Sequence, residues 1–138
     1  MNLEIFDKSW QPPAAARGFR SIGINRRNAR VTLSAILVQE MDIKPDMSLF
    51  LARNTEAKCE WYIRFDNSSD GLCIRSHKGG GYTKGVVSLG ITSRSITTKL
   101  LESCKADRGI SLLVAKTPTK INGQEWYQLI TSKPLRVN

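Results

Sequence analysis

The chain has 138 residues, of which 41% are hydrophobic and 24% are charged. This length and balance predict one compact domain, or two small units that share a core, and exclude an intrinsically disordered chain. The 21 lysines and arginines exceed the 12 acidic residues, which gives a formal charge of +9. That excess favours an anionic partner, most commonly nucleic acid; a basic surface that serves only solubility is the alternative.

The first residues, MNLEIFDKSW, include acidic side chains and no long hydrophobic run, so we expect no signal peptide. No segment approaches the roughly 18 consecutive hydrophobic residues of a membrane-spanning helix. The three cysteines, Cys59, Cys73 and Cys104, have no metal-ligand spacing, and an odd number argues against a disulfide framework. We expect Cys59 and Cys104 to be small core residues. The sequence therefore predicts a soluble cytoplasmic protein with no cofactor and no metal.

Three regions are expected along the chain: an arm over 1–16, a first unit over 17–70 and a second unit over 71–138. Gln11–Ala16 contains two prolines and favours an extended path. Leu3, Ile5 and Trp10 could anchor this arm on the body of the protein or on a partner. The two units are expected to pack together as one compact domain.

In the first unit, the sequence predicts a strand over 21–25, a turn over 26–28, a strand over 29–33 and a helix over about 34–42. The expected buried face of that helix has four side chains at helical spacing: Leu33, Ile36, Leu37 and Met41. Strands are also expected around 49–51 and over 59–65, where hydrophobic and polar residues alternate. Asn67–Gly71 is a predicted turn.

In the second unit, a strand over 72–76 precedes a mobile basic loop over 77–81, and further strands are expected over 84–91, 110–116 and 124–131. A helix capped by Thr92, Ser93 or Ser95 is expected to run to about Ala106. Its inward side chains would be Ile96, Leu100, Leu101 and Cys104. Asn122-Gly123 predicts a tight hairpin. The predicted fold is α+β, with a β-β-α-β-β unit present twice and a mainly antiparallel sheet.

Three short phrases occur twice in the same order, which favours an internal duplication. Ser21–Asn25 is echoed by Ser88–Thr92, and Ser48–Arg53 by Ser111–Lys116. Glu60-Trp61-Tyr62 is echoed by Glu125-Trp126-Tyr127. We therefore expect a pseudo-twofold arrangement in which Trp61 and Trp126 are buried in equivalent positions.

Two stretches, 8–39 and 71–101, contain basic residues but no acidic residue. Arginine suits phosphate because its planar group donates two parallel hydrogen bonds. The side chains expected to contact nucleic acid are Arg17, Arg20, Arg26, Arg27, Arg30, Arg75, Lys78, Lys84 and Arg94. The alternative is that these arginines only solvate an edge strand.

No catalytic constellation is visible in the sequence. His77 has no partner that would make it a base or a ligand, so we expect a solvated loop histidine. Glu60 and Glu125 are expected on the outer face of strands, outside any sheltered acid–base pair. Tyr62 and Tyr127 are candidates for stacking on bases. The sequence predicts a protein that is not an enzyme.

Residues 21–53 resemble the swapped-hairpin DNA-binding fold of the AbrB, MazE and MraZ type. Ala29–Ser34 matches the strand phrase of that family, and Gln39–Asp46 matches its helix exit. Ser34 replaces the preferred proline, and Asp42 and Asp46 replace glycines; aspartate tolerates the left-handed geometry needed there. The resemblance implies that Arg20, Arg26, Arg27 and Arg30 contact DNA.

We therefore expect a small DNA-binding protein, of a kind that could regulate transcription, which docks through arginine-rich hairpins without catalysis. One alternative is a non-enzymatic module of a larger assembly or homo-oligomer, with contacts through residues 1–16 and unpaired strands. Another is a binder of single-stranded nucleic acid that uses the sheet as a platform, as in folds of the Whirly or Pur type.

Overall fold

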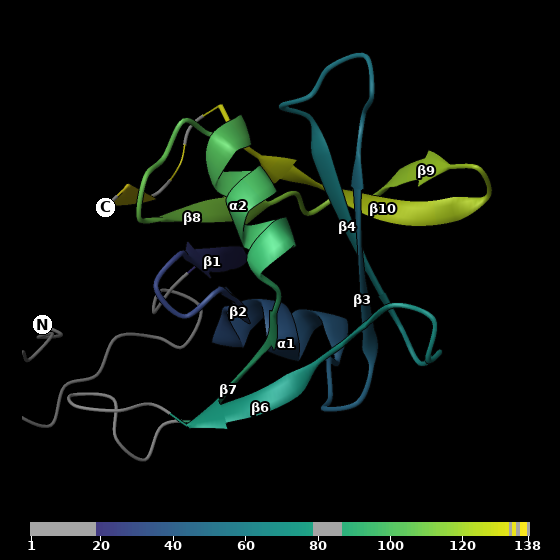
Figure 1. Ribbon diagram of the computed structural model, residues 1–138. Coiled ribbons are helices and arrows are strands. Elements are labelled where there is room, and N and C mark those ends of the chain that lie inside the picture. The colour runs from purple at the N-terminus through teal and green to yellow at the C-terminus, as the bar shows by residue number, and fades with distance from the viewer. Residues whose placement is uncertain (1–18, 79–86, 133, 135, 138) are drawn as a thin grey trace, which may run out of the picture.

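The computed structural model describes residues 19–78, 87–132, 134 and 136–137 (Figure 1). The expected arm over 1–16, together with Arg17 and Lys84, lies outside the described residues. The strands are β1 (Ser21–Asn25), β2 (Arg30–Leu33), β3 (Ser48–Arg53), β4 (Trp61–Asp66), β5 (Leu72–Cys73), β6 (Arg75–Lys78), β7 (Val87–Thr92), β8 (Gly109–Val114), β9 (Thr119–Ile121), β10 (Gln124–Ile130) and β11 (Arg136–Val137). The helices are α1 (Ala35–Met41) and α2 (Arg94–Ser103).

The strands form one antiparallel sheet that nearly closes on itself. Its order is β5-β3-β4-β10-β8-β1-β2-β7-β6, with β11 added to β8 and β9 added to β10. β5 and β6 are separated by Ile74 alone, yet β5 pairs with β3 while β6 pairs with β7. This one segment therefore connects the two ends of the sheet. The prediction of an α+β fold with a mainly antiparallel sheet is confirmed.

The core lies inside the curved sheet, because every second side chain of a strand points inward. In β1 these are Ile22 and Ile24, and in β8 they include Ile110 and Leu112, all buried. Four of the predicted helix-face residues, Leu33, Leu37, Leu100 and Leu101, are also buried. Met41, Ile96 and Cys104 are partly buried and pack against this core, whereas Ile36 is partly buried without belonging to it.

Each helix begins after a serine cap, and Ser93 is one of the three residues predicted to cap the second helix. The hydroxyl of Ser34 accepts a hydrogen bond from the Leu37 amide, and that of Ser93 accepts one from the Ile96 amide. Asp42, at the end of α1, has φ of 50°, and Asp46 has φ of 74°. Both aspartates thus adopt the expected left-handed geometry. The hairpin between β9 and β10 also turns at Asn122 and Gly123, both with positive φ.

Several details of the sequence prediction are wrong. Cys59 is exposed, because β4 begins only at Trp61. His77 lies within β6, opposite Ser88, and not in a loop. Trp61 is buried at 3% exposure, whereas Trp126 is only partly buried and stacks on Arg64, so the two tryptophans are not in equivalent environments.

The echo between Ser21–Asn25 and Ser88–Thr92 joins strands with different positions in the fold. β1 is followed by the turn into β2, whereas β7 leads directly into α2. Among the residues described, no helix is long and apolar enough to cross a membrane.

Candidate nucleic-acid interface

Five adjacent strands, β8, β1, β2, β7 and β6, present an outer surface of small, polar and basic side chains. Because Ile24, Val31 and Ile91 point into the core, the residues that alternate with them face outward. Those outward residues include Gly23, Asn25, Arg30, Thr32, Arg75, His77, Gly90, Thr92 and Ser111. None of the residues in these five strands is acidic. We call this surface the basic face.

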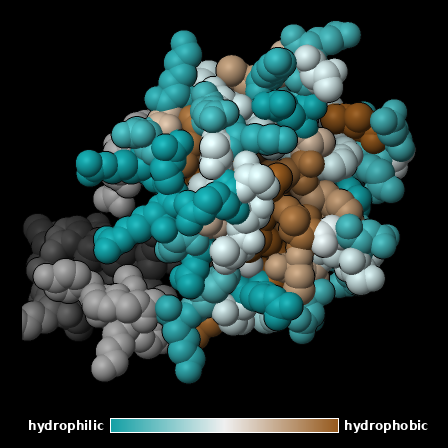
Figure 2. Space-filling view, in the orientation of Figure 1, coloured by the Kyte–Doolittle hydropathy of each residue, from teal (hydrophilic) through white to brown (hydrophobic). Residues whose placement is uncertain are grey.

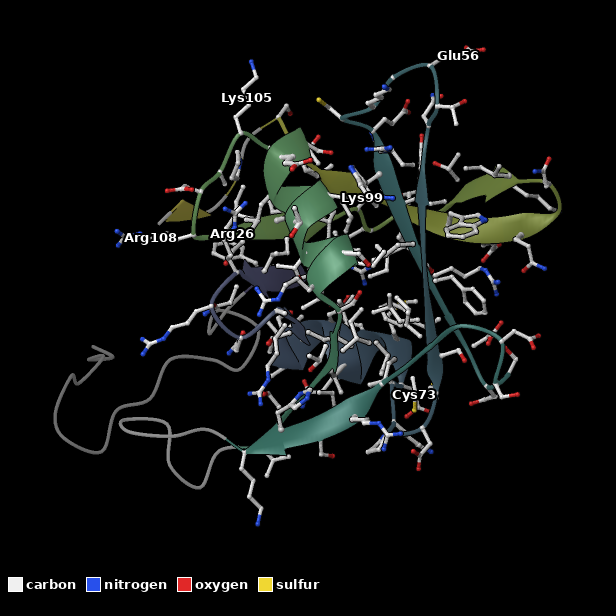
Figure 3. All side chains as sticks on the ribbon, viewed as in Figure 1. Arg26, Glu56, Cys73, Lys99, Lys105 and Arg108 are labelled. Carbon is white, nitrogen blue, oxygen red and sulfur yellow. The ribbon has the colours of Figure 1, made fainter. Side chains whose placement is uncertain are left out.

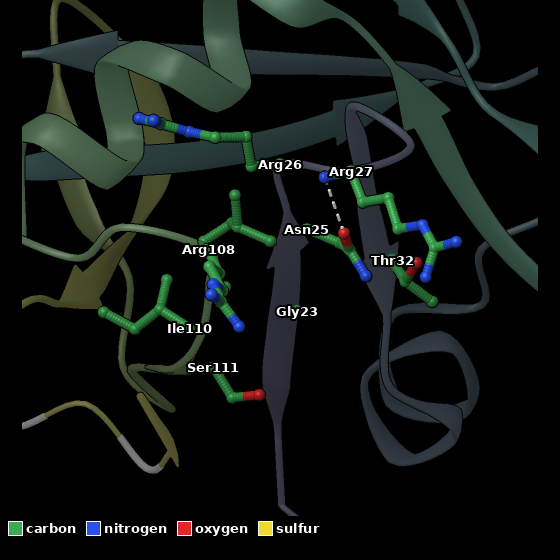
Figure 4. A pocket seen from close by; sticks show the side chains of 10 residues that line it. Gly23, Asn25, Arg26, Arg27, Thr32, Arg108, Ile110 and Ser111 are labelled. Carbon is green, nitrogen blue, oxygen red and sulfur yellow. Dashed lines mark hydrogen bonds between the residues drawn. The ribbon is translucent and has the colours of Figure 1, made fainter. Parts of the chain in front are cut away.

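A groove of about 650 Å³ runs over β1 on the basic face (Figure 4). Its floor is at Gly23, where an added Cβ would meet nothing closer than the Ser111 hydroxyl, at 4.0 Å. Arg27 and Thr32 line it on the β2 side, and Arg108 and Ser111 line it on the β8 side. We call this the Gly23 groove. Its lining combines polar and basic side chains with Ile24 and Ile110, and its floor at Gly23 carries no side chain.

The turn from β1 to β2 is held firmly at the end of this groove. The side-chain carbonyl of Asn25 accepts a hydrogen bond from the Arg27 amide at 2.9 Å, shown in Figure 4. The Arg26 amide donates to the carbonyl of Arg108 at 2.8 Å. On the other side of the turn, the carbonyl of Ala29 accepts a hydrogen bond from the Ser93 amide at 2.8 Å. The turn thus presents its arginines from a backbone fixed by β8 and by the start of α2.

The arginines at this end of the groove differ in how far their charge is compensated. Arg26 lies 3.6 Å from Asp107, and because the two side chains are 42% and 87% exposed, salt screens this pair readily. Arg94 donates to the carbonyl of Arg26 at 3.2 Å and so braces the turn. Arg27 and Arg108 are exposed, and no carboxylate among the described residues lies within ion-pair distance of either. Figure 3 shows Arg26 and Arg108 together at one edge of the molecule.

Arg20 is differently placed from the other predicted arginines. Its side chain is only 9% exposed and forms an ion pair with Glu40. It also donates to the carbonyl of Ala115 at 3.0 Å and lies 5.5 Å from the centre of the Tyr127 ring. These contacts already occupy the guanidinium, so we leave Arg20 out of the proposed interface.

The other end of the basic face is formed by β6 and β7. Arg75 and Lys78, both on β6, are exposed there. His77, which lies between them in the sequence, has a partly buried side chain. A groove of about 230 Å³ is lined by Cys73, Arg75, His77 and Thr92, with Leu72 and Ile91 as its apolar part. We call this the His77 groove. Figure 3 places Cys73 well away from Arg26 and Arg108, so the two grooves are separate.

The two predicted stacking residues, Tyr62 and Tyr127, differ in how far their rings are occupied. The Tyr62 hydroxyl donates a hydrogen bond to Glu60, which raises the pKa of Tyr62 and, with a hydrogen bond from Asn54, lowers the pKa of Glu60. Tyr127 is partly buried against the core and lies under Arg20. A base would have to displace Arg20 in order to stack on Tyr127, whereas the hydrogen bond of the Tyr62 hydroxyl does not cover the face of that ring.

A cluster that the sequence analysis did not single out lies on the outer face of β3, β4 and β10. The guanidinium of Arg64 lies 4.1 Å from the centre of the Phe50 ring and 5.3 Å from that of Trp126. Asp66 accepts a hydrogen bond from Arg64 at 2.7 Å, and hydrogen bonds from Ser68 lower the pKa of Asp66. This cluster is charge-compensated and its rings are covered, unlike the basic face.

The hydropathy of the surface differs between two sides of the molecule. In Figure 2, hydrophilic side chains dominate the side on which β1, β2 and the start of α2 lie, and hydrophobic residues reach the surface between α2 and β3.

Within the described part of the chain, no three His, Cys, Asp or Glu side chains are grouped to hold a metal ion. The chain matches no protein-family model, no curated protein and no solved structure.

Proposed function

We propose that this chain is a small nucleic-acid-binding protein that docks its basic face on the phosphates of duplex DNA and performs no catalysis. The observation that carries the proposal is the Gly23 groove. It is flanked by Arg27 and Arg108, and it lies on five adjacent strands without a single acidic residue. An uncompensated basic surface of this kind attracts polyanions over a long range.

The groove suits a phosphate backbone in shape as well as in charge. Gly23 leaves the floor open, so a phosphate can approach the strand closely. Arg27 and Arg108 can each donate paired hydrogen bonds to phosphate oxygens from opposite walls. Thr32 and Ser111 supply hydroxyl groups between them. Because the turn is fixed by backbone hydrogen bonds, little order has to be gained on binding.

Duplex DNA is favoured over a single strand by the distribution of aromatic residues. Single-strand binders usually stack bases on exposed rings. Here Tyr127 and Trp126 lie against arginines, which cover their rings. By contrast, the turn between β1 and β2 presents Arg26 and Arg27, whose guanidinium groups can reach the phosphates or the base edges of a duplex. Contacts from that turn to base edges would be the basis of any regulatory role.

We also propose that the fold arose by duplication of one β-β-α-β-β unit. In this proposal the first unit consists of β1, β2, α1, β3 and β4. In the second unit, β5 with β6 corresponds to β1, β7 to β2, α2 to α1, β8 to β3, and β10 to β4. The antiparallel pairs support it: β1–β2 has its counterpart in β6–β7, β3–β4 in β8–β10, and β1–β8 in β5–β3. Each unit's first strand would then pair with the third strand of the other unit, which interlocks the two as swapped hairpins.

Two further pairs, β2–β7 and β4–β10, are those that a pseudo-twofold axis requires, because each joins a strand to its own counterpart. The pairs that β9 and β11 make belong to the second unit alone. Val31 of β2 lies opposite Ile91 of β7, and both are buried. Tyr62 of β4 lies opposite Gln128 of β10. The echo between Ser48–Arg53 and Ser111–Lys116 fits this scheme. It aligns Leu49 of β3 with Leu112 of β8, and both residues are fully buried.

The function is tested by titrating the full chain with a duplex and with each of its separated strands, at about 50 and 200 mM salt. We expect the duplex to bind more tightly than either strand at low salt, and much more weakly at high salt. Tighter binding of the single strand would contradict the duplex assignment. Absence of binding at low salt would overturn the proposal, and the assembly-module alternative would then be preferred.

A further inference from the structure

His77 is the only histidine in the chain, and it lies on a strand and not in a solvated loop. It lies on β6, opposite Ser88 of β7, with its side chain partly buried. Its Nδ1 atom is buried and has no hydrogen-bond partner among the described residues. Buried polar atoms normally have a partner, because leaving one unsatisfied is energetically unfavourable. Because His77 lines a groove, this nitrogen is in a position to bind a ligand there.

Among the described residues, the charged side chains on the strands next to His77 are positive, and the carboxylate of Asp46 lies 4.0 Å from the Cys73 thiol at the side of the groove. Arg75 and Lys78 belong to the same strand, and Arg30 approaches from β2. β7 contributes no ionisable side chain, because Val87–Thr92 contains none. The only other ionisable group of the groove is the exposed thiol of Cys73. Burial, followed by the charge of Arg30, lowers the pKa of His77 below its usual value of 6.5. An anion would be attracted here by Arg30, Arg75 and Lys78, and opposed by Asp46 from the Cys73 side of the groove.

The His77 groove also supplies hydrogen-bond donors of the right kind. Arg75 provides a guanidinium, Thr92 a hydroxyl and His77 a ring N–H. The groove has about a third of the volume of the Gly23 groove, which suits one phosphate group and its linking atoms. In the duplication proposed above, β6 and β7 correspond to β1 and β2. The His77 groove would then be the counterpart of the Gly23 groove in the second unit.

We infer that Arg75, His77 and Thr92 form a second phosphate site, which binds a backbone phosphate of the same nucleic acid that occupies the Gly23 groove. This inference rests on the proposed function and adds a specific residue role to it. Arg30, on the strands between the two grooves, would contribute charge to the path from one to the other. In the bound state, His77 takes up a proton and donates a hydrogen bond to a phosphate oxygen.

Because the chain has a single histidine, NMR can follow its imidazole without ambiguity. The experiment is to titrate the pH of the full-length chain, free and saturated with duplex DNA, and to record the pKa of His77. A negative phosphate favours the charged imidazolium, so the pKa should rise by about one unit or more on binding. By linkage, the duplex should bind about tenfold more tightly at low pH than at high pH, and His77→Gln should abolish that difference.

Arg75→Gln serves as the second variant, since it removes charge from the groove and leaves the reporter in place. It should reduce the rise in the His77 pKa, whereas Lys120→Gln, on the separate β9–β10 hairpin, should leave that rise unchanged. Inorganic phosphate, at the same concentration of phosphate groups, should produce little change. An equal rise with inorganic phosphate would show that the groove takes free phosphate, and would overturn the assignment to a nucleic-acid backbone.

The outcomes separate this inference from the proposed function. If duplex DNA binds and the pKa of His77 does not rise, the second site is refuted while the Gly23 groove retains its assignment. If DNA does not bind at all, both proposals fail together. A rise in the pKa that Arg75→Gln leaves intact would also refute the site, because it would place the phosphate away from the His77 groove.

Discussion

Gly90 of β7 lies directly opposite Thr32 of β2, and the strands approach so closely that a Cβ on Gly90 would lie 2.2 Å from the carbonyl oxygen of Val31. Gly23, on the same sheet, has open space above it, with its nearest neighbour at 4.0 Å. The two glycines belong to echoed phrases of the sequence, yet one permits close strand packing and the other leaves a groove open.

This contrast predicts that an alanine substitution destabilises the protein at Gly90 and has little effect on stability at Gly23. Gly90→Ala should lower the free energy of unfolding by about 1–3 kcal/mol, because backbone atoms of β2 must move to admit the new methyl group. Gly23→Ala should change it by no more than about 0.5 kcal/mol, as for a surface residue. Urea unfolding of the two variants beside the parent measures both values. Equal losses in the two variants would show that the close approach of β2 and β7 is not real.

A larger side chain at Gly23 should block the groove without harming the fold. Valine suits a strand, and its methyl groups would extend from the floor of the Gly23 groove into its open space. We expect Gly23→Val to keep the stability of the parent and to weaken duplex binding at least tenfold. Ala52→Val, which adds bulk to the outer face of β3, is the matched control and should bind as the parent does. Unchanged binding by Gly23→Val would mean that DNA does not enter the groove.

The stability of the free protein should depend on pH through His77. Burial holds the pKa of His77 below 6.5 in the folded chain, so the unfolded chain takes up a proton first as the pH falls. The free energy of unfolding should therefore decrease on going below about pH 6.5, until the folded histidine is also protonated.

The His77→Gln variant should lack this part of the pH dependence. The difference between the stability curves of the parent and the variant gives the contribution of His77, because the carboxylates titrate in both proteins. Parallel stability curves for the two proteins between about pH 7 and pH 5 would contradict the burial of His77.

Much of the fold could be predicted from local patterns. Alternation identified the strands around Leu49 and Ile63, and helical spacing identified Leu37 and Leu100 as core residues. The serine caps and the Asn122-Gly123 hairpin also followed from residue type, since their geometry depends on few neighbours. The pairing of β1 with β8, by contrast, joins residues far apart in the chain and has no local signal.

The candidate site was only partly predictable for the same reason. The acid-free stretches indicated Arg27 and Arg30, but Arg108 follows Asp107 in a mixed segment and is brought to the groove by the pairing of β8 with β1. Arg20 looked equivalent to its neighbours until its long-range contact with Glu40 was known. His77 appeared to belong to a loop because the glycines after it obscured the end of β6.

The central claim is that Arg27 and Arg108 neutralise DNA phosphates from the two walls of the Gly23 groove. Each phosphate contact releases counterions, so the logarithm of the affinity falls with the logarithm of salt by about 0.9 per contact. Both side chains are exposed, and replacing them with glutamine should leave the fold unchanged. A double variant, Lys116→Gln with Lys120→Gln, removes the same charge from exposed positions outside the basic face.

The most direct test is therefore the salt dependence of duplex binding by the parent, by Arg27→Gln with Arg108→Gln, and by the lysine control. We predict that the arginine variant binds much more weakly and that its slope is shallower by about two, while the control keeps a slope close to that of the parent. Equal slopes in the parent and the arginine variant, or an equal loss in the lysine control, would contradict the assignment of the Gly23 groove as the DNA-binding site.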